Sequence, residues 1–126
     1  NDGASIMALT YYGSTRYMQS YNVMGVAKAA LETSIKYLAV DMGDRGIRVN
    51  AISAGPMRTL AGAVINKSRK IYNYTIENSP IKKPLSLEDI GKSSVYLMSD
   101  LSKGVTGEIL YVDNGYNNVG MSIQDL

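Results

Sequence analysis

The most restrictive feature of this sequence is a strand–helix–strand pattern near its start. Residues 5–10 form a short apolar run that is typical of a buried parallel strand. Residues 21–42 carry apolar side chains at spacings of three and four, which predicts one long helix. Residues 47–53 predict a second strand, and a helix between two strands is the βαβ unit of a parallel sheet. We therefore expect an α/β fold.

Shorter elements are expected after this unit. Residues 59–65 are small and apolar with weak helical character, and residues 67–78 predict a further helix. Ser86, followed by acidic residues in the first turn, predicts the start of another helix. Residues 108–112 predict the last strand, and no structure is assigned to residues 116–126.

The chain contains no cysteine and no histidine, which excludes several kinds of site. A disulfide framework, a thiolate metal site and Ser-His-Asp chemistry cannot form within it, and no metal site is expected. Its 13 basic and 11 acidic residues give a net charge of +2, which does not favour nucleic-acid binding. Without a signal peptide or an apolar run of membrane-spanning length, a cytoplasmic protein with no membrane contact is the default expectation.

Tyr21 and Lys28 lie seven positions apart within the predicted long helix. Seven steps of an α-helix leave two side chains within roughly 20° of each other and about 10.5 Å apart along the axis. One face would then carry a phenol and an ammonium, so that a substrate could meet the first and a cofactor the second. The turn at Gly55 and Pro56 ends the second strand, which is where α/β proteins bind ligands.

Four segments together resemble one enzyme family. They are Tyr11-Tyr12-Gly13 and residues 21–28, 47–61 and 107–115. The chain resembles the carboxyl-terminal half of the NADH-dependent enoyl-acyl-carrier-protein reductases of bacterial fatty-acid synthesis, a divergent branch of the short-chain dehydrogenase/reductases. The resemblance implies that residues 1–126 form the carboxyl-terminal part of one Rossmann-like domain with a doubly wound parallel sheet. Within it, residues 57–78 would form a substrate-binding lid region.

The Tyr–Lys spacing bears on the reaction that the resemblance implies. Ordinary short-chain dehydrogenases place the two residues four positions apart and reduce ketones, but the residue four before Lys28 is Met24, which is a poor partner for a carbonyl. The implied reaction is hydride transfer from NADH to the β-carbon of a trans-2-enoyl thioester. Tyr21 would donate a hydrogen bond to the thioester oxygen. A ketone reductase of the same superfamily is a disfavoured alternative.

The resemblance also implies the roles of individual residues. Tyr21, Tyr11 and Lys28 would be catalytic, and Lys28 would also bind the nicotinamide ribose. The cofactor would lie under Met57, Arg58, Thr59, Leu60 and Ala61, and the acyl chain would lie among Tyr11, Tyr21, Met24, Ala61 and Ile65. Each role has an ordinary alternative: Met24 and Ile65 could equally be core residues, and Tyr21 and Lys28 could be an unremarkable aromatic and lysine on a helix.

Partners are expected from charge and from what the sequence lacks. A basic cluster could dock an acidic acyl carrier protein or be an ordinary solvated surface, and two of its residues, Arg69 and Lys70, follow the small apolar segment 59–65 that would gate the acyl chain. The cluster consists of Lys67, Arg69, Lys70, Lys82 and Lys83. No Gly-x-Gly-x-x-Gly pattern occurs, and the chain starts without methionine almost directly in an apolar run. We therefore expect the amino-terminal dinucleotide-binding half to be absent and a sheet edge to be open. The chain alone should then bind NADH poorly.

Two classes of function remain open at this point. The chain would act as one half of an enoyl reductase, with its amino-terminal half as a partner. Alternatively, it would be a non-catalytic fragment that serves only as a packing or oligomerising module. The long predicted helix, apolar on two sides, suits both, because the family forms homotetramers through it.

Overall fold

A three-stranded parallel sheet organises the computed structural model, which describes residues 3–65 and 67–121. The strands are β1 (Ala4–Thr10), β2 (Ile47–Ala54) and β3 (Ile109–Val112), in the order β1-β2-β3. The register runs from Ala4 opposite Ile47 to Thr10 opposite Ser53, so that β1 and β2 end together. The predicted α/β class, parallel sheet and strand positions are confirmed.

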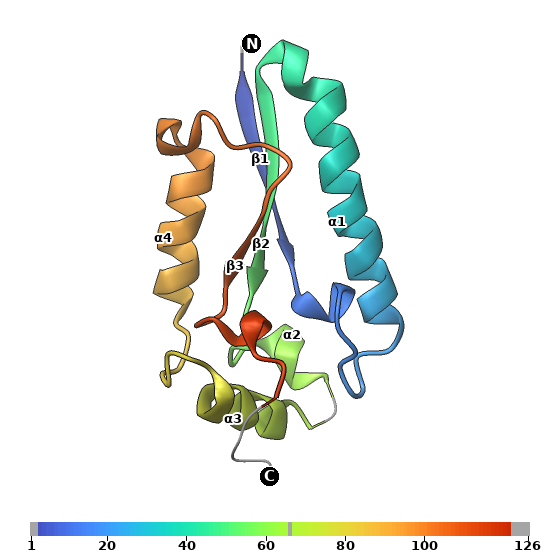
Figure 1. Cartoon of the computed structure of the whole chain (residues 1–126), viewed down its shortest axis with the longest axis vertical. Helices are drawn as coiled ribbons and strands as arrows, with labels where there is room; N and C mark the ends of the chain where they lie inside the picture. Colours follow the sequence, from blue (N-terminus) through green and yellow to red (C-terminus); the bar gives the residue numbers. More distant parts are fainter. Residues whose placement is uncertain (1–2, 66, 122–126) are drawn as a thin grey trace.

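The two long helices cover opposite faces of this sheet, on either side of it in Figure 1. They are α1 (Val23–Met42) and α4 (Leu87–Met98). Ile35 and Ala39 of α1 pack against Val49 and Ala51 of β2. Ile90 and Leu97 of α4 pack against Ile52, which points the other way because side chains alternate along a strand. This three-layer arrangement is that of a doubly wound sheet.

The start of α1 differs from the prediction, because the helix begins at Val23 and not at Tyr21. Asn22 precedes it with φ of 51° and ψ of −130°, and Ser20 has φ of 67°. These backbone angles are not helical, so residues 20–22 turn the chain before the first helical residue. The expectation that Tyr21 and Lys28 share one helical face is therefore wrong: only Lys28 lies on the helix.

Two short helices lie beyond the carboxyl ends of the strands, near the base of Figure 1. They are α2 (Leu60–Ala63) and α3 (Ser68–Asn78), close to the two helical segments predicted there. Single 3-10 turns complete the chain, at Tyr12–Ser14, Gly43–Arg45, Asp100–Ser102 and Tyr116–Asn118. Residues 122–126 lie outside the described part of the chain.

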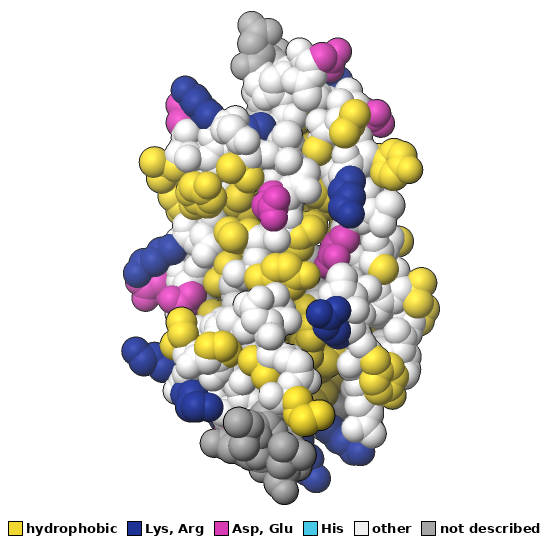
Figure 2. Space-filling view, in the orientation of Figure 1, with side chains coloured by type: hydrophobic (Ala, Val, Ile, Leu, Met, Phe, Trp, Pro, Cys, Tyr) yellow, Lys and Arg dark blue, Asp and Glu magenta, His cyan; other side chains and the backbone are white. Residues whose placement is uncertain are grey.

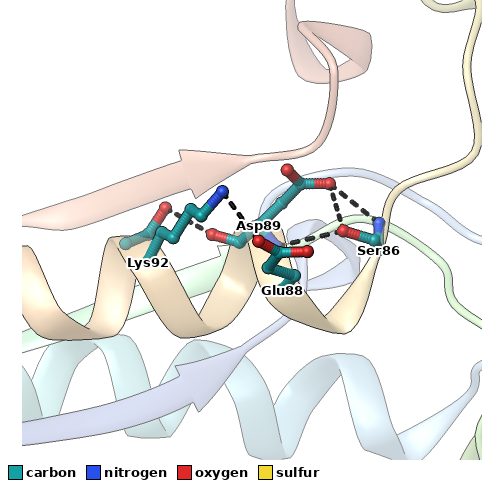
Figure 3. Close-up of polar contacts among 5 residues, drawn as sticks. Ser86, Glu88, Asp89 and Lys92 are labelled. Carbon is teal, nitrogen blue, oxygen red and sulfur yellow. Dashed lines mark hydrogen bonds and ion pairs between the residues drawn. The ribbon is translucent and has the colours of Figure 1, made fainter.

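The predicted start of α4 is confirmed as a capping box (Figure 3). The Asp89 amide donates to Ser86 Oγ over 3.1 Å, and the Ser86 amide donates to Asp89 Oδ2 over 2.9 Å. The Ser86 hydroxyl also donates to Asp89 Oδ2 over 2.7 Å, and this bond, together with the one from the Ser86 amide, holds the pKa of the Asp89 carboxyl below its usual value. Lys92 and Glu88, one turn apart, form an exposed ion pair of 2.8 Å beside the box.

β1 is only partly buried, contrary to the prediction of a buried strand. Ile6 and Leu9 are 42% and 53% exposed, because β1 pairs with β2 on one side and with no other described strand. The open edge that the sequence predicts is therefore present in the described part of the chain. Hydrophobic side chains also reach the surface on the opposite, β3 side of the sheet, in the band between α4 and α1 in Figure 2. None of the described helices combines the length and the apolar character needed to span a bilayer.

Candidate active site

The predicted site residues gather where the strands end. Tyr11 directly follows β1, Gly55 directly follows β2, and α1 starts near the same end of the sheet (Figure 1). The shared register places Thr10 of β1 opposite Ser53 of β2. The carboxyl edge of a parallel sheet is the usual ligand-binding edge of α/β proteins.

Tyr11 and Tyr21 are in direct contact. Their ring centroids lie 5.0 Å apart with an interplanar angle of 73°, an edge-to-face arrangement. Tyr21 is 8% exposed, although it stands outside the helix on which it was predicted. The orientation of the Tyr21 ring is therefore set by its contact with Tyr11 and not by a position on the helix.

Two glycines make this contact possible. A Cβ atom on Gly13 would lie 2.6 Å and 2.8 Å from two atoms of the Tyr21 ring. A Cβ atom on Gly25 would lie 2.9 Å from the carbonyl oxygen of Gly13. All three distances are shorter than side chains tolerate, so the turn at residues 12–14 can pack against the start of α1 only because both positions lack a side chain.

Burial keeps both phenols in the protonated form. Burial raises the pKa of Tyr21, and for Tyr11 the proximity of Tyr21 and Tyr116 raises the pKa further. Among the described residues, neither hydroxyl has a hydrogen-bond partner. Each hydroxyl is thus a neutral donor at neutral pH that a ligand can engage.

The tyrosine contact extends to the end of β3. The Tyr12 ring lies 5.2 Å from Tyr11 and 5.5 Å from Tyr116, both edge-to-face. Burial and a hydrogen bond with Tyr116 raise the pKa of Tyr12. Asp113 holds the turn before Tyr116, since its carboxylate accepts bonds from the amides of Gly115 and Asn117. Sequence reasoning missed Tyr12 and Tyr116; the Tyr-Tyr pair at positions 11 and 12 was the available signal.

Lys28 lies beside the same residues. Its ammonium donates to the carbonyl of Leu9 over 2.9 Å, which places the charge at the end of β1. An ammonium has three N–H donors, so two remain for the hydroxyls of a ligand such as a ribose. Its position is thus fixed by β1 and by α1 together.

The predicted cofactor segment lines a pocket of about 450 Å³. Arg58 stacks over the ring of Tyr72 in α3, with its guanidinium carbon 5.1 Å from the ring centroid. Thr59 caps α2 by accepting a bond from the Gly62 amide over 3.0 Å. The residues that line this pocket include Met57, Arg58, Thr59, Leu60, Arg69 and Tyr72. No described contact joins this pocket to Tyr11 or Tyr21.

The remaining predicted residues occupy different environments. Met24 lies in the first turn of α1 and is 46% exposed, and Ile65 is half-buried just after α2. Ala61 lies within α2, but its side chain is outside the described part. Arg69 and Lys70 are exposed in the first turn of α3. Glu32, one turn after Lys28 on α1, is buried beside the Tyr11 turn and was not anticipated.

Comparisons with known proteins give a consistent family. A family model described as enoyl-(acyl carrier protein) reductase matches residues 1–117. The chain is 59% identical over 125 residues to enoyl-[acyl-carrier-protein] reductase [NADH] 1 of Rhizobium meliloti, covering 99% of this chain and 46% of the relative. The chain therefore spans about half the length of the curated relatives it matches.

Solved structures agree with this match. The crystal structure of FabI from Candidatus Liberibacter asiaticus superposes with a TM-score of 0.92 at 59% identity, over 95% of this chain and 46% of that one. The enoyl-(acyl-carrier-protein) reductase of Anaplasma phagocytophilum, solved in complex with NAD, superposes with a TM-score of 0.91 at 53% identity. It covers 96% of this chain and 46% of that one.

Proposed function

The chain belongs to the enoyl-(acyl-carrier-protein) reductase family, and on this premise we propose that it forms the carboxyl-terminal half of an NADH-dependent reductase. The substrate would be a trans-2-enoyl-acyl-carrier-protein thioester in fatty-acid elongation. The observation that supports this most is the pair of protonated, edge-to-face tyrosines beside the Lys28 ammonium, at the carboxyl end of β1.

Tyr21 is the proposed donor to the reacting oxygen. When bound, NADH supplies the hydride that the β-carbon of the substrate receives. Negative charge then develops on the thioester oxygen, and the Tyr21 hydroxyl stabilises it by donating a hydrogen bond. A preorganised donor of this kind contributes ~3 kcal/mol to transition-state stabilisation. Tyr11 holds the Tyr21 ring at 5.0 Å and forms the opposite wall of the acyl pocket.

Lys28 is the proposed ligand of the nicotinamide ribose. The bond to the Leu9 carbonyl uses one of its donors, and the other two match the two hydroxyl oxygens of a ribose diol in number. Residues 57–61 would cover the nicotinamide and pyrophosphate, as the resemblance implies. The pocket that Met57, Arg58, Thr59 and Leu60 line supports this assignment, since it is also lined by residues of α2 and α3. Both helices lie at the same end of the sheet (Figure 1).

The position of Met24 supports reduction of a C=C bond over a ketone. Met24 stands four residues before Lys28 on α1, where a ketone reductase would carry its tyrosine. A thioether has no proton to donate to a carbonyl oxygen. Tyr21 supplies the donor from the turn that precedes the helix.

We expect activity to require an amino-terminal dinucleotide-binding half. The open edge of β1, with Ile6 and Leu9 exposed, is the surface such a half would cover. The test uses a fusion protein, called the completed enzyme below, in which this chain is joined in one polypeptide to the amino-terminal half of the Rhizobium meliloti relative. The completed enzyme should oxidise NADH in the presence of a short trans-2-enoyl-CoA, whereas the chain alone should not.

A spectrophotometric assay at 340 nm of both proteins checks this expectation. A folded completed enzyme that leaves NADH unchanged would contradict the proposal and favour a non-catalytic packing module. A packing role is compatible with the second apolar side of α1. Its exposed members are Val23, Val26, Tyr37 and Val40. In the proposed enzyme this side would contact neighbouring subunits of a homotetramer.

Arg69 and Lys70 are the proposed docking residues for the acyl carrier protein. Both are exposed at the start of α3, and Arg69 also borders the Met57–Leu60 pocket. Reversing both charges (Arg69→Glu with Lys70→Glu) should raise KM for an acyl-carrier substrate about tenfold, because an acidic carrier would be repelled. KM for the same acyl group on coenzyme A should change little.

The matched control reverses two exposed charges elsewhere, with Lys36→Glu on α1 and Arg45→Glu after it. This control gives the same change in net charge and should leave both KM values unaltered. Equal effects of the α3 reversal on both substrates would exclude carrier docking at this surface.

A further inference from the structure

Glu32 is a buried carboxylate that the proposed chemistry does not use. It is 8% exposed, and its Oε1 atom accepts hydrogen bonds from Thr10 Oγ1 over 2.7 Å and from Ser14 Oγ over 2.6 Å. Burying a carboxylate is costly unless hydrogen bonds replace its hydration. The two short bonds to Oε1 offset this cost and fix the hydroxyls of Thr10 and Ser14 relative to α1.

The two hydroxyl donors bracket Tyr11 along the chain. Thr10 is the last residue of β1 and directly precedes Tyr11, while Ser14 ends the 3-10 turn Tyr12–Ser14 that follows it. That turn is short: the amides of Ser14 and Thr15 donate to the carbonyls of Tyr11 and Tyr12 over 3.0 Å each. So short a turn has little stability of its own, and its direction depends on anchors outside it.

The anchor stands on the helix that also carries Lys28. Glu32 follows Lys28 by four residues, so both side chains lie on the same side of α1. Lys28 fixes the carbonyl of Leu9, and Glu32 fixes the hydroxyls on either side of Tyr11. One helix face thereby sets the position of the ammonium and of the tyrosine turn together.

We propose that Glu32 is a positioning residue that holds Tyr11, and through it Tyr21, in register with Lys28. The effect reaches Tyr21 because its ring is confined between Gly13 of this turn and the ring of Tyr11. This inference rests on the proposed function, since it assigns Glu32 a role in aligning that site. Glu32 acts through the two tyrosines and does not itself touch the substrate.

The test compares two replacements of Glu32 in the completed enzyme. Glu32→Ala removes the acceptor and should lower kcat about tenfold or more, because small displacements of catalytic groups have large effects on rate. KM for NADH should stay within about twofold, because Lys28 keeps its bond to Leu9. Glu32→Gln retains a carbonyl oxygen that can accept both hydroxyl bonds, so its kcat should stay within about threefold of the parent.

A readout besides activity separates alignment from a general loss of stability. The edge-to-face contact shifts the ring-proton NMR signals of Tyr11 and Tyr21, and these shifts should collapse toward free-tyrosine values in Glu32→Ala but not in Glu32→Gln. Thr33→Ala, an exposed neighbour in the same helix, is the matched control and should change neither shifts nor kcat. A folded Glu32→Ala enzyme with parental kcat and parental shifts would overturn the proposal, as would equal damage from Ala and Gln.

If Glu32→Ala does not fold, the donors can be removed instead. The double variant Thr10→Val with Ser14→Ala should then show the same loss of kcat, and full turnover in that variant would overturn the proposal. The proposed function fails separately, namely if Tyr21→Phe retains full turnover. Loss in Tyr21→Phe with no loss in Glu32→Ala would contradict the role of Glu32 alone.

Discussion

Replacing Tyr21 by phenylalanine in the completed enzyme is expected to lower kcat roughly a hundredfold. The variant keeps the ring that packs against Tyr11 and Gly13 and removes only the hydroxyl. The lost interaction forms with an oxygen that becomes charged in the transition state, so kcat should fall and KM for the enoyl substrate should change little. Steady-state kinetics with a short trans-2-enoyl-CoA and NADH measure both constants.

The burial of Tyr21 sharpens this expectation. The raised pKa keeps its hydroxyl protonated well above neutral pH, so the variant should be slow across the neutral range and not at one pH only. Tyr17→Phe is the matched control, because Tyr17 is 89% exposed and belongs to no described contact of the site. A Tyr21→Phe enzyme as fast as the Tyr17→Phe control would show that the phenol does not act on the reacting oxygen.

Gly13→Ala is expected to have an effect of similar size through a different cause. The added methyl would lie 2.6 Å from the Tyr21 ring, and a ring so confined can only move away. Gly13 does not need a positive φ angle, so the alanine backbone is unstrained and the effect comes from the clash. A displacement of the phenol by about 1 Å should reduce kcat by about a hundredfold, with KM for NADH unchanged.

A second glycine-to-alanine variant provides the control. A Cβ atom on Gly91, within α4, would meet nothing within 4 Å, so Gly91→Ala should leave kcat intact and stabilise the helix by about 0.5–1 kcal/mol. Turnover and the urea midpoint of both variants can be measured in parallel. Parental turnover in Gly13→Ala would mean that the ring contact does not control the position of Tyr21.

The local elements could be predicted because their signals are local. The apolar run at residues 5–10 and the one at 47–53 became β1 and β2, and Ser86 starts α4 through its bond with Asp89. Each of these signals depends on a few neighbouring residues and on steric or hydrogen-bonding rules that act within one turn. The family followed from the combination of four such segments, and the family match confirms it.

The geometry of the site could not be predicted in the same way. Periodicity placed Tyr21 on the helix that carries Lys28, but the unusual backbone at Ser20 and Asn22 ends that periodicity before Val23. The solvent exposure of β1 also differed from the prediction, again because it depends on tertiary structure. The apolar residues of β1 were expected to be buried, yet burial depends on the elements that cover a strand, and here one edge has no described neighbour.

The sequence by itself thus determined the helices and strands, their order, and the residue types available at the ends of the strands. The meeting of the Tyr11 turn, the Tyr21 ring and the Glu32 carboxylate was set by three-dimensional packing, because these groups belong to segments that no periodicity relates. Those segments can approach each other because Gly13 and Gly25 have no side chains. Whether residues far apart in the sequence can pack closely is decided only in the folded chain, and the proposed alignment of Tyr11, Tyr21 and Lys28 depends on such packing.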